Sequence, residues 1–270
     1  MIKYNFKKSN IIYLILLVLL LILFSVNIYK SFKNYKILIL YTSYRQNEEI
    51  ELSSKFINNT NILKNADLLF YCNNPSMFEN IDNLVKLFNN KNKKIVKSKK
   101  NAGGGRDGYV MGQMEGIADL YKHYHNYDYV IQIHPDVYIT NESEIIKILN
   151  KYNNSKVGLI VNKSIPDEKK ETYGIPKKDK WFSSDFFIFK PKNIPFNIFN
   201  LWKKYRDENN GKVYIPEHLL YLLSRDYKIP YAYVKRFDND FYDPRRIDML
   251  KVWHEHDLEK VKEYLRKNNL

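Results

Sequence analysis

The fold is decided by residues 127–138, which read Tyr127-Asp-Tyr-Val-Ile-Gln-Ile-His-Pro-Asp-Val-Tyr138. The apolar centre of this stretch predicts a strand that is buried on both faces and ends at His134. Pro135 has no N–H for a sheet ladder, so we expect the chain to leave the sheet there and expose Asp136 at the strand end. Ligands of α/β sheets bind beyond the carboxyl ends of the strands. The stretch therefore predicts an imidazole and a carboxylate at a binding site.

Strands and helices alternate along the rest of the chain. Short apolar runs predict strands at residues 36–42, 68–72, 94–97, 157–161, 185–190 and 231–234. Between and after them, helices are expected at residues 48–57, 77–88, 109–124, 144–152, 196–205 and 217–224, and from residue 258 onward. This alternation predicts a three-layer α/β/α fold with a mainly parallel central sheet.

Composition excludes several classes of protein. The 270 residues are 44% hydrophobic, enough for a substantial core. The net charge is +14, and a lysine-rich run at residues 91–100 either forms a solvated surface or attracts an anionic nucleotide or membrane. No nucleic-acid-binding motif accompanies the charge, so nucleic acid is not an expected partner. Cys72 is the single cysteine, which rules out an internal disulfide and a cysteine-cluster zinc site.

The amino-terminal region predicts a membrane anchor. Residues 11–29 form an almost unbroken apolar segment that is just long enough to span a bilayer, after a short tail at residues 1–10. A cleaved signal peptide is the alternative, but Ser25-Val26-Asn27 is a poor cleavage site. Lysines flank both ends, so the positive-inside rule hardly discriminates, and the usual behaviour of such anchors favours a single-pass type II orientation.

A glycine-rich loop spans residues 103–108 and formally matches G-x-G-x-x-G. We reject a dinucleotide fingerprint because the acidic residue twenty positions on, Asp128, opens a strand instead of closing one. One interpretation is a turn in which Asp107 caps the next helix. The other is a substrate-facing loop in which Arg106 pairs with an anionic donor and Asp107 fixes a sugar or ribose hydroxyl.

Four segments together resemble nucleotide-sugar glycosyltransferases of the GT-A fold. They are Gly105-Arg106-Asp107, the strand that runs into His134-Pro-Asp136, Ser183-Ser-Asp-Phe-Phe-Ile-Phe-Lys-Pro191, and Pro216-Glu-His218. The resemblance covers roughly residues 36–265, and the Gly-Arg-Asp element is also similar to rhamnan-synthesis-type transferases. With its predicted anchor, the chain is similar to membrane-anchored viral or protist glycosyltransferases as well.

The resemblance implies a domain at residues 36–270 that transfers a hexosyl or deoxyhexosyl group. The donor would be a nucleotide-diphosphate sugar, the acceptor a glycan or glycoconjugate, and the cofactor Mn²⁺ or Mg²⁺. Residues 36–140 would form the nucleotide-sugar-binding half, with Thr42 at the end of the first strand, and residues 141–270 the acceptor-binding half.

The same resemblance places a metal at the His134-Pro-Asp136 segment, where the family carries Asp-X-Asp. Asp136 is the expected metal ligand. His134 departs from the family pattern, and it would bind the metal, contact the donor phosphate or cap the sheet. His254 is the better candidate for a carboxyl-terminal histidine that returns to the metal, with His256 second. The alternative is that both are surface histidines ahead of a helix capped by Asp257.

Glu217 is the candidate general base for the acceptor hydroxyl, with Asp185 as the alternative. A purely structural interpretation is also open, because a carboxylate at the start of a helix is favoured by the helix dipole.

Two other functions stay open. One is a membrane-anchored carbohydrate-binding or scaffold protein with a degenerate transferase fold, because the first Asp of the usual motif is missing. The other is a nucleotidyltransferase, which ranks lower because residues 42–45 lack the glycines of a pyrophosphate loop.

Overall fold

The computed structural model describes residues 13, 15–17, 35–43, 47–72, 74–77, 79–97, 125–161, 182, 184–195, 216–234 and 252–270. The chain divides into two compact units, Met1–Tyr35 and Lys36–Leu270. All the strands that the structure describes belong to the second unit.

Among the described residues, a seven-stranded sheet forms the centre of the second unit, in the order β3-β2-β1-β4-β7-β6-β8. Its strands are β1 (Ile37–Ser43), β2 (Asp67–Cys72), β3 (Lys93–Lys97), β4 (Tyr129–Ile133), β6 (Leu159–Val161), β7 (Phe186–Phe189) and β8 (Tyr231–Tyr233). The first four in this order are mutually parallel, whereas β7 is antiparallel to both β4 and β6. The expected α/β fold with a mostly parallel sheet is confirmed.

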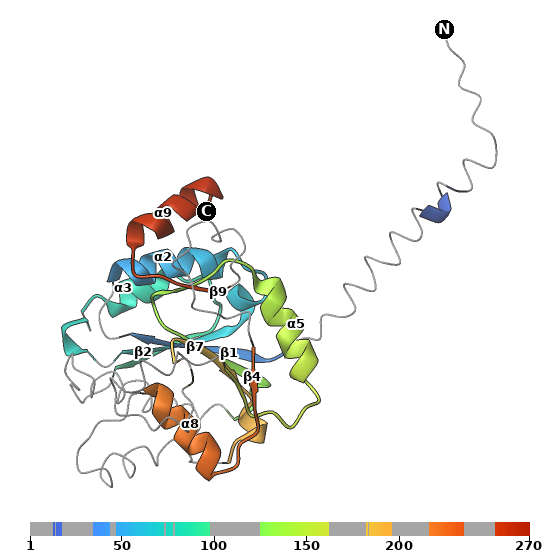
Figure 1. Cartoon of the computed structure of the whole chain (residues 1–270). Coiled ribbons are helices and arrows are strands. Elements are labelled where there is room, and N and C mark those ends of the chain that lie inside the picture. Colours follow the sequence, from blue (N-terminus) through green and yellow to red (C-terminus); the bar gives the residue numbers. More distant parts are fainter. Residues whose placement is uncertain are drawn as a thin grey trace. The chain divides into compact units, whose positions relative to one another are not determined.

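Helices cover both faces of this sheet (Figure 1). On one face lie α2 (Asn47–Asn58) and α3 (Ile81–Lys86), with α9 (Leu258–Lys267) packed beyond α2. On the opposite face lies α8 (Pro216–Asp226), and α5 (Glu142–Tyr152) flanks the sheet. Every residue of β1 and β4 is buried, as their continuous apolar sequences predicted.

Two hydrophobic clusters hold these layers together. The first lies between the sheet and α8 and includes Leu40, Phe187 and Leu219. The second joins α2 to α9 and includes Phe56 and Trp253. Within this second cluster, Tyr138 packs between Phe56 and Trp253, with its ring centroid 5.2 Å from that of Phe56 and 5.8 Å from that of Trp253.

A small second sheet pairs β5 (Val137–Ile139) with β9 (Val252–His254) in antiparallel register. The sequence pattern did not predict this sheet. The chain leaves the main sheet after β4, as Pro135 predicted, but it enters this second sheet at once. The expectation that Asp136 is exposed is therefore wrong, because the residue is only 6% exposed.

The helix expected at residues 77–88 is shorter than predicted. Its α-helical part begins at Ile81, and Pro75–Met77 forms a separate 3₁₀ turn. The helices expected at residues 109–124 and 196–205 lie outside the described residues.

In the first unit, the structure describes a few helical residues, Tyr13 and residues 15–17, whose side chains are exposed. A search of the described parts of the chain finds no helix with the length and apolarity to cross a bilayer. Most of residues 11–29 lie outside those parts, so the anchor stays a prediction.

Lys190 ties α5 to the end of β7. Its ammonium donates to the backbone carbonyls of Tyr152, Asn153 and Ser155 at 2.8, 2.9 and 2.7 Å. These carbonyls lie at and just beyond the carboxyl end of α5, where backbone acceptors lack intrahelical partners and a cation is favoured. The lysine therefore completes the end of the helix and fixes it to the sheet.

We expect Lys190→Met to lower the free energy of unfolding by about 2–3 kcal/mol, because it removes a charged donor from three partly buried carbonyls, of which those of Tyr152 and Ser155 keep other donors. Lys192→Met is the matched control. The Lys192 side chain is 64% exposed and pairs with Asp128 at 2.9 Å, so its loss should cost less than about 1 kcal/mol. Urea denaturation of both variants measures the difference, and equal losses would contradict the role given to Lys190.

Candidate active site

Three strand ends meet at one edge of the main sheet and bring acidic and imidazole side chains together. His134 directly follows β4, and Asp185 directly precedes β7. Because β7 is antiparallel to β4, its start lies beside the end of β4, with Ile133 opposite Phe186. The His134 N–H donates to the Asp185 carbonyl at 3.0 Å and extends this pairing by one step.

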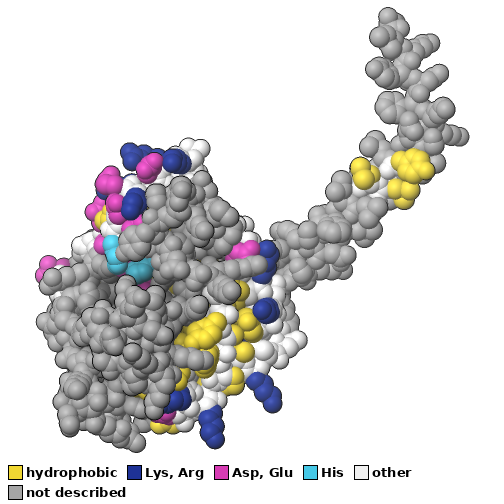
Figure 2. Space-filling view, viewed as in Figure 1, with side chains coloured by type: hydrophobic (Ala, Val, Ile, Leu, Met, Phe, Trp, Pro, Cys, Tyr) yellow, Lys and Arg dark blue, Asp and Glu magenta, His cyan; other side chains and the backbone are white. Residues whose placement is uncertain are grey.

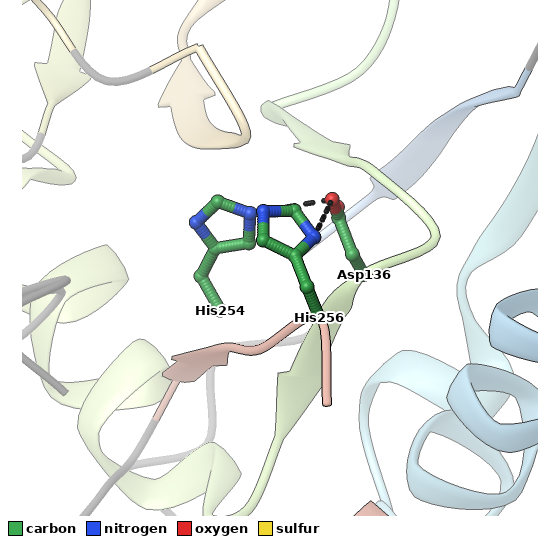
Figure 3. Close-up of side chains that lie close together, drawn as sticks. All are labelled: Asp136, His254 and His256. Carbon is green, nitrogen blue, oxygen red and sulfur yellow. Dashed lines mark hydrogen bonds and ion pairs between the residues drawn. The ribbon is translucent and has the colours of Figure 1, made fainter. Parts of the chain in front are cut away.

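The third contribution comes from β9 through the small sheet. Val137 lies opposite His254 in the register, and the Glu255 N–H donates to the Asp136 carbonyl at 3.1 Å. This pairing places the imidazoles of His254 and His256 against the Asp136 carboxylate (Figure 3). His254 Nε2 lies 3.2 Å and His256 Nδ1 lies 3.4 Å from Asp136 Oδ2.

Asp136, His254 and His256 fit a divalent cation. One ligand atom from each lies within 4.8 Å of the others. Asp136 Oδ1 is buried and has no hydrogen-bond partner among the described residues, so the carboxylate has unused capacity to bind a ligand. A carboxylate with two imidazoles suits Mn²⁺ better than Mg²⁺, which prefers oxygen ligands. The His256 side chain is 70% exposed, and Figure 2 shows histidine side chains reaching the surface beneath the charged residues of α9.

Asp185 forms a second centre beside the first. Its Oδ1 lies 3.4 Å from His134 Nδ1, and its Oδ2 lies 3.6 Å from His254 Nδ1. Burial alone would raise the pKa of Asp185, but the contact with His134 and the charge of His254 hold it well below its usual range. For His254 burial acts in the opposite direction and would lower the pKa, yet the contacts with Asp136 and Asp185 raise it to about 9.

Glu217 stands at the start of α8 with the opposite electrostatic character. Burial, together with the negative charge of Asp185, raises the pKa of Glu217 to about 7. The Ser184 hydroxyl donates to Glu217 Oε1 at 2.7 Å, and the Phe182 N–H donates to the Glu217 carbonyl at 3.1 Å. At neutral pH this carboxyl group is therefore divided between its acid and base forms.

The structure brings most of the predicted site residues together. Five of them lie close enough to form ion pairs or to shift one another's pKa: His134, Asp136, Asp185, Glu217 and His254. His134 contacts Asp185 and is not a member of the candidate metal-ligand group, which instead includes His256.

Thr42 is buried in β1, one residue beyond the Tyr41 and Ile133 pair, and its hydroxyl accepts a hydrogen bond from Gln132 at 2.7 Å. Arg106 and Asp107 lie outside the described residues. The carboxylate of Asp257 accepts from the Glu259 N–H at 3.2 Å and caps α9, but His254 is partly buried and not a surface histidine.

Sequence reasoning missed Ser184 as the partner of Glu217. The Ser183-Ser184-Asp185 segment ahead of an aromatic strand was the available signal, but only the antiparallel direction of β7 brings it to the start of α8.

No protein-family model matches the sequence, and no curated protein sequence matches it either. Solved structures do match its fold. The galactosyltransferase LgtC, in complex with donor and acceptor sugar analogs, has a TM-score of 0.54 at 12% identity, over 85% of this chain and 94% of LgtC.

A glycosyltransferase involved in the glycosylation of the major capsid of PBCV-1 has a TM-score of 0.51 at 9% identity, over 84% of this chain and 98% of that one. WbbM, a bifunctional glycosyltransferase, has a TM-score of 0.52 at 11% identity, over 83% of this chain and 46% of WbbM. At such identities the likeness establishes the fold, which this chain shares with glycosyltransferases.

The raised pKa of Glu217 predicts a pH-dependent stability. In the folded protein the pKa of Glu217 is about 7, whereas its ordinary value, which applies in the unfolded chain, is 4.5. Between pH 4.5 and pH 7 the folded state therefore keeps a proton that the unfolded state loses, so wild type should lose stability as pH rises through this range. Glutamine stays neutral, so we expect Glu217→Gln to gain about 2 kcal/mol relative to wild type between pH 5 and pH 8.

Urea denaturation at both pH values measures this gain. Glu263→Gln, on the exposed side of α9, is the matched control and should differ from wild type equally at both. A Glu217→Gln variant that behaves like this control would place the carboxyl of Glu217 in water.

Proposed function

We propose that this protein is a metal-assisted glycosyltransferase that moves a hexosyl or deoxyhexosyl group from a nucleotide-diphosphate sugar to a glycan or glycoconjugate acceptor. The observation that carries the proposal is the Asp136, His254 and His256 group, which lies where the parallel sheet of a glycosyltransferase fold ends. The structure of LgtC in complex with donor and acceptor sugar analogs supports the substrate classes.

Asp136, His254 and His256 would hold the cation. When bound, a divalent ion such as Mn²⁺ neutralises charge on a diphosphate and makes it a better leaving group. Asp136 supplies the negative ligand, and His254 at the end of β9 and His256 two residues later close the site. This arrangement gives the histidine of the His-Pro-Asp segment a different task, because His134 faces Asp185.

Glu217 is the better candidate for the general base. A carboxyl group with a pKa of about 7 can accept the proton that the acceptor hydroxyl loses as its oxygen bonds to the sugar. Ser184 donates to Oε1 and leaves Oε2 for the acceptor. Asp185 is a weaker base, because its neighbouring imidazoles hold its pKa well below the usual range.

We extend the proposal to two parts of the chain that lie wholly or mostly outside the described residues. Arg106 and Asp107 would contact the donor, and residues 11–29 would hold the enzyme at a membrane with a single-pass, type II orientation. Full-length protein that resists extraction by alkaline carbonate supports the anchor. A mature amino terminus near Asn27 would point to a cleaved signal peptide.

A degenerate transferase fold that only binds carbohydrate is the second candidate. Its specific support is that His134 replaces the first Asp of the family motif and does not join the metal-binding group. Transfer by the wild type with any member of a panel of UDP- and GDP-sugars would exclude it.

Donor binding should depend on Mn²⁺ and on Asp136. We expect Asp136→Ala to weaken Mn²⁺-dependent binding of the active nucleotide sugar by about 100-fold in calorimetry, because the site loses the carboxylate of the three-residue group. Asp82→Ala, which removes a carboxylate that is 59% exposed, is the control and should bind like wild type. Unchanged Mn²⁺-dependent affinity in Asp136→Ala would remove this residue from the site.

Turnover should depend on Glu217. We expect Glu217→Gln to keep donor affinity and lower kcat by about 10²–10⁴-fold, because glutamine keeps the shape of the side chain but cannot take a proton. Glu263→Gln again serves as control. Transfer at the wild-type rate by Glu217→Gln would exclude the residue as the base.

A further inference from the structure

The two carboxylate oxygens of Asp185 face two different imidazole rings. Oδ1 lies 3.4 Å from His134 Nδ1, and Oδ2 lies 3.6 Å from His254 Nδ1. The side chain is 22% exposed, and its backbone is fixed by the hydrogen bond from His134 at the start of β7. The β4–β7 pairing therefore sets the backbone position from which the carboxylate contacts His134, and the β5–β9 pairing brings His254 to its other oxygen.

The ring of His254 lies between two carboxylates. Nε2 is 3.2 Å from Asp136 Oδ2 on one side, and Nδ1 is 3.6 Å from Asp185 Oδ2 on the other. A histidine that binds a metal through one ring nitrogen keeps its proton on the other, and that N–H commonly donates to a carboxylate. Closure of the second contact to about 3.0 Å would make it such a hydrogen bond.

We propose that Asp185 is a positioning residue that acts through His254 on the cation. It holds the proton of His254 on Nδ1 and turns Nε2 toward Asp136. The inference rests on the metal-assisted function proposed above and goes beyond it, because it gives Asp185 a task other than proton abstraction.

His134 belongs to the same chain of contacts. By holding Asp185 Oδ1, it leaves Oδ2 for His254, so the order of contacts is His134, Asp185, His254 and then the cation site. His256 approaches Asp136 with its ring turned 76° from that of His254, and it acts on Asp185 through its charge, whereas the Nδ1 atoms of His134 and His254 face the two oxygens of Asp185. Asp185 should therefore affect the metal chiefly through His254.

A double-mutant cycle with Mn²⁺ alone as the probe tests this order. Binding of Mn²⁺ to the full chain is followed by the loss of the free-ion signal in electron paramagnetic resonance. We expect Asp185→Asn to weaken Mn²⁺ affinity by about 10–100-fold. In a His254→Ala background, the same change should cost less than about 2-fold, since the group through which it acts is gone.

Two further variants sharpen the result. Asp185→Glu keeps the charge but moves the oxygens by one methylene, so a positioning role predicts weakened Mn²⁺ affinity here too, and this variant serves if Asp185→Asn does not fold. Asp128→Asn removes a paired carboxylate at the opposite end of β4, where it contacts Lys192, and should bind Mn²⁺ like wild type.

The turnover number separates positioning from catalysis. At saturating Mn²⁺, Asp185→Asn should recover kcat to within about 10-fold of wild type, because a weakened metal site can be filled by mass action. A base would leave kcat low at any concentration of Mn²⁺.

Each outcome has a defined meaning. Additive losses in the cycle, wild-type Mn²⁺ affinity of Asp185→Asn, or a kcat that Mn²⁺ does not restore would each overturn the inference and leave the metal-assisted function standing. A wild type that binds no Mn²⁺, or whose affinity is indifferent to Asp136→Ala, would overturn the proposed function and this inference with it.

Discussion

Two carboxylates, the buried Asp136 and the partly buried Asp185, lie together at one edge of the sheet, and the arrangement of the site follows from the need to pair them. A buried carboxylate without a partner costs several kcal/mol, so it persists only where cations or donors face it. Here the partners are imidazoles from β9 and from the end of β4. The small β5–β9 sheet is thus part of the site, because it supplies His254 across 118 residues of sequence.

The sequence predicted those parts of the fold that depend on local pattern. The short, mainly apolar runs of β1 and β4 are typical of buried strands, and the helix after Asp257 begins where a side-chain cap allows it. The β5–β9 pair escaped prediction because each strand has three residues, which is too short for a periodic signal. The contact of His134 with Asp185 escaped as well, since it requires β7 to be antiparallel to β4, and apolar pattern carries no information on strand direction.

The burial of Asp136 shows how one unpredicted pairing changes the chemistry of a predicted residue. An exposed aspartate at a strand end would be a freely hydrated anion, and a cation would gain little from it in water of high dielectric constant. Covered by β9, the same carboxylate is 6% exposed and keeps one oxygen without a partner among the described residues. The attraction for a cation is therefore stronger than the strand end alone would give.

Glu217 and Asp185 illustrate how two neighbouring carboxyl groups come to differ in chemistry. Glu217 stands at a helix start, where the dipole favours the anion by about 0.3–1 kcal/mol. Its pKa is nevertheless about 7 and not 4.5, a change equivalent to about 3 kcal/mol, so burial and the charge of Asp185 outweigh the dipole. Asp185 is kept anionic by imidazoles, and its charge in turn raises the pKa of Glu217. Asp185, which is paired with histidines, is thus suited to hold the imidazole ring of His254 in place. Glu217, which has no such pairing, is suited to accept and release a proton.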